Sequence, residues 1–129
     1  MSARQAKCED RIDNHLQSRL EDLRSLLDCE DPDEGVEDIG TIYDYGLGFD
    51  YVEPFTFGDD QRDGYWSYQL SWGGPSDEFR IWTDGARIRI VEYWFLDWFD
   101  GAHVDVSDDD TIRDLMDWFD GWGAFEAHP

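Results

Sequence analysis

The chain has 129 residues, of which 32 are acidic and 10 are basic, so its formal net charge at pH 7 is −22. This charge argues against direct binding to nucleic acid or to an anionic membrane surface, because both would repel the chain. Seven Trp, six Tyr and eight Phe argue against a disordered acidic tail, which would be poor in aromatic residues. We expect one folded acidic domain over residues 1–129, with residues 1–7 flexible.

The first predicted element is a helix from Cys8 to Asp28. Its apolar residues recur every three or four positions and make one stripe that we expect to face the core: Ile12, Leu16, Leu20, Leu23 and Leu27. Along this helix Cys8 and Cys29 would lie about 30 Å apart, so we expect free thiols rather than a disulfide. Free thiols, a polar start without a signal-peptide stretch and the absence of a long apolar run predict a cytoplasmic protein.

An acidic loop follows at residues 28–38, where Pro32 and Gly35 break regular structure. The β-branched and aromatic residues after it predict one or two short strands, around 41–45 and 49–57.

The centre of the chain predicts an antiparallel meander of three strands. In residues 65–72 large apolar side chains occupy every second position, as in a strand with one buried face: Trp66, Tyr68, Leu70 and Trp72. A Gly-Gly-Pro turn leads to a strand that begins near Phe79. Asp84 and Gly85 then predict a tight hairpin into a third strand, 87–95.

The last predicted element is a helix from Asp108 to Phe119, with Ser107 as its N-cap. Together the elements predict the α+β class, with an antiparallel sheet of about four strands and the N-terminal and C-terminal helices packed on it.

Some acids favour the fold, because Asp108, Asp109 and Asp110 lie at a predicted helix N-terminus, but the placement of others indicates that they serve the surface. Several lie at C-terminal helix ends, where the helix macrodipole disfavours negative charge: Asp28, Glu30, Asp117 and Asp120. Two segments, 28–38 and 97–110, are rich in acids and free of Lys and Arg, and we predict that they contact a basic partner. We add Trp98 to the predicted contact residues because Trp is a frequent interface anchor. The predicted contact residues are Asp28, Glu30, Asp31, Asp33, Glu34, Glu37, Asp38, Asp97, Trp98, Asp100, Asp105, Asp108, Asp109 and Asp110.

No residue pattern predicts catalysis or a resident metal. His15, His103 and His128 show no metal-ligand spacing with one another or with the cysteines. The acidic clusters lack the spacing of a calcium-binding loop, and Gly73-Gly74 lacks the pattern of a phosphate loop. We therefore expect a protein that is not an enzyme and that carries no cofactor and no metal.

Small size, extreme acidity and many aromatic residues in an α+β pattern resemble the DNA-mimic inhibitors encoded by phages and plasmids, including anti-CRISPR and anti-restriction proteins. The stretches YQLSWGGPSDEFR (68–80) and IVEYWFLDWFDGAHVDV (90–106) look similar to proteins of mobile elements. The resemblance implies a stoichiometric inhibitor that occupies the nucleic-acid channel of a basic protein or complex in the host cytoplasm. We expect a monomer or a homodimer, since exposed aromatic residues would permit a dimer.

Two alternatives stay open from the residues. One is an immunity-type protein that neutralises a single basic toxin, such as a nuclease, through aromatic anchors. The other is an acidic protein of a salt-rich cytoplasm, which the 23 Asp, nine Glu and single Lys favour but which leaves the many aromatic residues unexplained. Such a protein would need salt to fold, because salt screens its self-repulsion.

Overall fold

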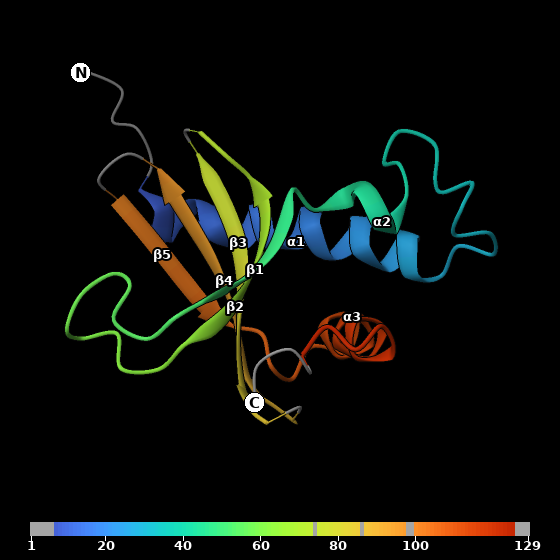
Figure 1. Cartoon of the computed structure of the whole chain (residues 1–129). Helices are drawn as coiled ribbons and strands as arrows, with labels where there is room; N and C mark the ends of the chain where they lie inside the picture. The colour runs from blue at the N-terminus through green and yellow to red at the C-terminus, as the bar shows by residue number, and fades with distance from the viewer. Residues whose placement is uncertain (1–6, 74, 86, 98–99, 126–129) are drawn as a thin grey trace, which may run out of the picture.

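The computed structural model describes residues 7–73, 75–85, 87–97 and 100–125 as a two-layer α+β domain (Figure 1). Five antiparallel strands form one sheet in the order β1-β2-β3-β4-β5. The strands are β1 (Gly48–Val52), β2 (Tyr65–Ser71), β3 (Ser76–Asp84), β4 (Arg87–Asp97) and β5 (Asp100–Asp105). The helices are α1 (Cys8–Leu27), α2 (Ile42–Tyr45) and α3 (Asp110–Gly121). The α+β class and the two terminal helices are confirmed, whereas the expectation of about four strands is one too low.

The strand that the sequence did not predict is β5. Tyr93 pairs with Val104 and Phe95 with Ala102, so the second half of β4 continues into a hairpin instead of an acidic loop. Ala102 and Val104 pack against the core, while His103 between them is exposed. Alternation over only two small apolar residues is a weak strand signal, which explains the omission.

Two element boundaries also differ from expectation. Residues 42–45 form the short helix α2 rather than a strand, because Thr41 caps it and accepts a hydrogen bond from the Asp44 N–H at 3.3 Å. The N-cap of α3 is Asp109 rather than Ser107, whose hydroxyl oxygen instead accepts from the Val91 N–H at 2.9 Å. The first helix and the Asp84–Arg87 hairpin lie where the sequence predicted them.

The core lies between the inner face of the sheet and the helices. Figure 1 shows α1 crossing behind the strands and extending past the β1 side of the sheet, where α2 and α3 flank it. The largest fully buried side chains come from β3, β4, α1, α3 and the C-terminal segment: Phe79, Ile81, Val91, Tyr93, Phe95, Cys8, Leu23, Ile112, Leu115 and Phe125. Both cysteines are free, as expected. No helix of the described chain is long and apolar enough to span a membrane.

A buried polar network fastens α1 to the sheet through Asp77, which is 3% exposed. Arg19 of α1 donates to both carboxylate oxygens of Asp77, from Nε at 2.7 Å and from Nη2 at 3.0 Å. Tyr93 donates its hydroxyl to the same carboxylate at 2.6 Å, and Ser71 donates as well. Arg19 also donates to the Tyr45 hydroxyl at 3.0 Å, so α2 is joined to the same network.

This network predicts a pH dependence of stability. Burial raises the pKa of Asp77, but hydrogen bonds from Arg19, Ser71 and Tyr93 outweigh burial and hold that pKa below its ordinary value. The ionised carboxylate therefore stabilises the fold above the unfolded-state pKa of about 3.9, and this contribution is lost as the pH falls below it. We expect the difference in unfolding free energy between the unmodified protein and Asp77→Asn to be largest above about pH 5 and to shrink toward pH 3. Urea unfolding over this pH range measures it, and a difference that did not change with pH would contradict the assignment.

Candidate partner-binding surfaces

The acidic loop, residues 28–38, has a fixed backbone although its charged side chains lie in solvent. The N–H groups of Glu34 and Gly35 donate to the Asp31 carbonyl at 3.2 and 3.1 Å. Gly35 has a φ of 74°, and a Cβ there would lie 2.2 Å from the Gly40 carbonyl oxygen, so the turn requires glycine. Two partly buried side chains anchor the end of this segment on the core: Val36 and Ile39.

Most carboxylates of the acidic loop have no cation of their own. The loop carries seven exposed acids: Asp28, Glu30, Asp31, Asp33, Glu34, Glu37 and Asp38. Among the described residues only Asp28 of these seven has an ion pair, with Arg24 at 3.0 Å. The other six repel one another, and a positive surface would relieve that repulsion.

The second predicted segment, 97–110, uses several of its acids to hold the fold. Arg11 donates to Asp97 at 2.6 Å, and the Cys8 N–H donates to Asp100 at 2.7 Å. The bond from Cys8 also lowers the pKa of Asp100 below its ordinary value. These two contacts join the β4–β5 hairpin to the N-terminal turn of α1, so both acids serve the fold.

The remaining acids of this segment lie near the start of α3. Asp105 accepts from the Ser107 N–H at 2.8 Å, and hydrogen bonding by Ser107 lowers the Asp105 pKa. Asp109 caps α3 by accepting from the Ile112 N–H at 3.1 Å. Asp108 and Asp110 are exposed, and Asp108 lies 3.6 Å from Arg113. Trp98, the predicted aromatic anchor, lies outside the described residues.

The hairpin end of the second segment, with Asp97 and Asp100, does not share a surface with the acidic loop. Asp100 contacts the first residue of α1, whereas the acidic loop follows the last residue of that helix. A helix of this length separates its ends by about 30 Å. Figure 1 shows the β4–β5 hairpin and the loop after α1 on opposite sides of the molecule. The predicted site therefore divides at the hairpin, whereas the start of α3 stays on the side of the acidic loop, since Arg24 bonds to Thr111 and also pairs with Asp28. Among the described residues, the acidic loop is the part in which most carboxylates have no ion pair.

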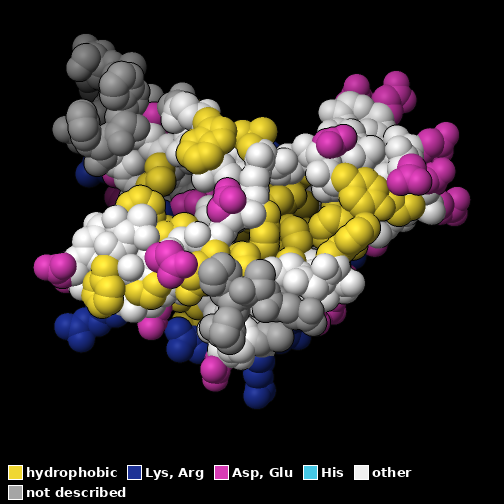
Figure 2. Space-filling model, viewed as in Figure 1, with side chains coloured by type: hydrophobic (Ala, Val, Ile, Leu, Met, Phe, Trp, Pro, Cys, Tyr) yellow, Lys and Arg dark blue, Asp and Glu magenta, His cyan; other side chains and the backbone are white. Residues whose placement is uncertain are grey.

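Three aromatic side chains from α2, from α3 and from the residue that caps α3 form a partly exposed aromatic cluster next to the acidic loop: Tyr43, Trp118 and Trp122. The Tyr43 ring centroid lies 5.9 Å from that of Trp118 and 6.1 Å from that of Trp122, and the two indoles are 6.0 Å apart. Tyr43 is 48% exposed and Trp122 is 67% exposed. Figure 2 shows hydrophobic side chains gathered in the hollow between α2 and α3. The adjacent end of the molecule carries many acidic side chains. Exposed aromatic rings next to charged groups are typical of protein interfaces.

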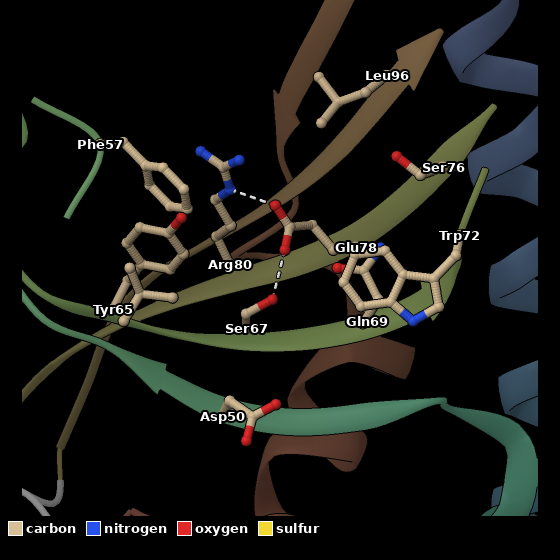
Figure 3. A pocket seen from close by; sticks show the side chains of 11 residues that line it. Asp50, Phe57, Tyr65, Ser67, Gln69, Trp72, Ser76, Glu78, Arg80 and Leu96 are labelled. Atoms are coloured by element: carbon tan, nitrogen blue, oxygen red, sulfur yellow. Dashed lines mark hydrogen bonds and ion pairs between the residues drawn. The ribbon is translucent and has the colours of Figure 1, made fainter. Parts of the chain in front are cut away.

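A third feature lies on the sheet face that the helices leave open, a pocket of about 350 Å³ (Figure 3). On its floor, Ser67 donates to one carboxylate oxygen of Glu78, and Arg80 Nε donates to the other at 2.6 Å. Glu78 is only 7% exposed, although this face of the sheet has no covering helix. The apolar part of the wall consists of Val52, Phe57, Tyr65, Trp72 and Leu96.

The arginine of this pocket is held between aromatic rings. The guanidinium carbon of Arg80 lies 3.8 Å from the Trp94 ring centroid and 5.0 Å from that of Tyr65. Sequence reasoning missed the pocket because it assigned Trp72 to the buried face of its strand, whereas Trp72 is 71% exposed. The sequence does contain a sign of the pocket, because polar residues alternate with apolar ones in both β2 and β3. This alternation places Ser67, Glu78 and Arg80 on one face of the sheet.

Within the described ranges, no group of three His, Cys, Asp or Glu side chains is placed to hold a metal ion. The surfaces that remain for function are the acidic loop, the aromatic cluster and the pocket on the open sheet face. Comparisons with protein-family models, with curated proteins and with solved structures give no match.

Proposed function

We propose that the protein is a stoichiometric inhibitor that binds the basic surface with which a target protein holds nucleic acid. The observation that carries the proposal is the set of exposed carboxylates in the acidic loop that lack a cationic partner among the described residues. Such carboxylates can take the place of phosphates opposite Lys and Arg of the target. The proposed contact surface is the acidic loop together with the adjacent aromatic cluster.

The shape of the acidic loop supports this function. Its backbone hydrogen bonds order the main chain that carries the carboxylates, which lowers the backbone entropy lost when a partner docks. The net charge of −22 would steer a basic target toward the protein and raise the association rate, with a strong dependence on salt.

The aromatic cluster favours a second candidate, an immunity-type protein that neutralises one basic toxin. Tyr43 and Trp122 offer large exposed rings beside acids, and such anchors bind one complementary shape rather than any basic groove. The two candidates differ in the distribution of binding energy. A DNA mimic spreads it over many carboxylates, whereas an immunity-type protein concentrates it in a few anchors.

Neutralising three acids of the acidic loop is expected to weaken partner binding about tenfold, since exposed charge pairs contribute roughly 0.2–1 kcal/mol each. The variant is Asp33→Asn, Glu34→Gln and Glu37→Gln, whose side chains are exposed and accept none of the hydrogen bonds recorded in this loop. The measurement is retention of proteins from a lysate of the encoding cell at about 100 mM NaCl, followed by elution with salt and competition with duplex DNA.

The matched control removes the same charge elsewhere, by Asp59→Asn, Asp60→Asn and Asp84→Asn, all of which are exposed. We expect the control to retain the target as the unmodified protein does. An equal loss in both variants would assign binding to total charge and remove the acidic loop from the site. A target that duplex DNA fails to displace would overturn DNA mimicry.

A further inference from the structure

The pocket on the open sheet face carries more negative than positive charge. Its lining residues include two carboxylates, Asp50 and Glu78, and one guanidinium, that of Arg80. The guanidinium is already bonded to Glu78, so Asp50 is the carboxylate left over. An anionic ligand would therefore meet more repulsion than attraction here, and a cationic ligand the reverse.

The pocket also offers aromatic rings that the fold leaves uncovered. Phe57 and Trp72 are each 71% exposed. Figure 3 shows Trp72 on one side of the pocket floor, Phe57 and Tyr65 on the other, and Asp50 on the neighbouring strand β1. The faces of such rings attract cations, and most strongly where a carboxylate lies close by.

The protein's own arginine shows what this sheet face accepts. Arg80 stacks on Trp94, approaches Tyr65 and pairs with Glu78, so a guanidinium there is satisfied by two rings and one carboxylate. The lining of the pocket offers groups of the same kinds that are not used by Arg80: the carboxylate of Asp50 and the exposed rings of Trp72 and Phe57, which lie on opposite sides (Figure 3). Asp50 is exposed and has no ion pair among the described residues.

We propose that this pocket binds an arginine side chain of the basic partner, with Asp50 pairing with the guanidinium and the exposed ring of Trp72 stacking against it. A guanidinium suits the site better than an ammonium because it is planar, weakly hydrated and able to stack on rings while it pairs with a carboxylate. The inference rests on the proposed function for the identity of the partner, and it adds a specific contact to the charge-based attraction.

The test uses a defined probe, N-acetyl-arginine N-methylamide, titrated into the full chain at low salt and followed by NMR of backbone amides and Trp indoles. We expect shifts at Trp72 and Ser67, and at least fivefold weaker binding of the neutral citrulline analogue. Trp72→Ala and Asp50→Asn are each expected to weaken binding of the arginine probe about three- to fivefold. The loop variant Asp33→Asn, Glu34→Gln, Glu37→Gln removes three acids away from the pocket and should leave probe affinity within twofold.

Equal binding of the citrulline analogue, or shifts that gather on the acidic loop and vanish in the loop variant, would overturn the pocket assignment. Unchanged affinity in Asp50→Asn would overturn it as well, independently of any effect of Trp72→Ala on folding. Any of these results would refute the pocket but not the proposed function, provided that the loop variant no longer retains the target that duplex DNA displaces. Conversely, a pocket that selects arginine while the loop variant keeps its target would support the site and refute the proposed role of the acidic loop.

Discussion

Replacing Arg19 with methionine is expected to lower the free energy of unfolding by about 3 kcal/mol, the lower end of the range for breaking a buried ion pair. The substitution keeps most of the apolar stem but removes both hydrogen bonds from Arg19 to Asp77. Asp77 is 3% exposed, so its charge would stay buried without a counterion. Urea unfolding followed by tryptophan fluorescence at pH 7 measures the loss.

Arg113→Met provides the matched control, because Arg113 makes a looser pair at 3.6 Å with Asp108 and both side chains are exposed. We expect it to change the unfolding free energy by less than about 0.5 kcal/mol. Similar losses in the two variants would show that net charge, rather than the buried network, explains the effect. Adding Asp77→Asn to Arg19→Met should recover part of the loss, because the uncompensated charge is then removed.

The same network bears on the proposed binding surface. Arg19 joins α1 to Asp77 of the sheet and to Tyr45 of α2, and the acidic loop connects these two helices. The position of the free carboxylates therefore depends on a buried contact in the middle of α1. A variant that loosens this contact would make the conformation of the acidic loop less defined, even though every residue of the loop is unchanged.

The sequence predicted well those elements that have a regular apolar repeat or a characteristic turn. The stripe from Ile12 to Leu27 predicted α1 to within one residue, and the turn at Asp84 and Gly85 predicted the β3–β4 hairpin. The strand β5 was missed because Ala102 and Val104 become apolar partners only when they lie beside Phe95 and Tyr93. Its existence depends on tertiary pairing rather than on local preference.

The sequence shows where the acidic residues lie along the chain, but not which of them bond to the rest of the fold. Asp97 and Asp100 look like the acids of the 28–38 segment in the sequence, yet they bond to Arg11 and Cys8 at separations of 86 and 92 residues. Such contacts appear only once β5 and α1 are brought together. The pocket was hidden for a related reason, since the burial of Glu78 on an open sheet face depends on side chains from several strands.

Replacing Phe119 with alanine is expected to destabilise the fold by about 3–5 kcal/mol, the usual cost of removing a buried aromatic ring. Phe119 is 7% exposed, and its ring centroid lies 4.6 Å from that of Phe49 and 4.9 Å from that of Tyr68. These contacts pack α3 against β1 and β2. The measurement is the urea midpoint at constant slope, and a loss below about 1 kcal/mol would mean that α3 packs more loosely than the structure indicates.

Trp122, three residues further along, makes the matched control because it is the same kind of side chain placed on the surface at 67% exposure. Trp122→Ala is expected to change stability by less than about 0.5 kcal/mol, since surface substitutions cost little. Its effect on target binding then separates the two candidate functions without a folding artefact. A loss of about thirtyfold or more would identify Trp122 as a dominant anchor and favour the immunity-type protein. A loss of only a few fold, beside a clear loss in the acidic-loop variant, would favour a DNA mimic whose binding energy is spread over its carboxylates.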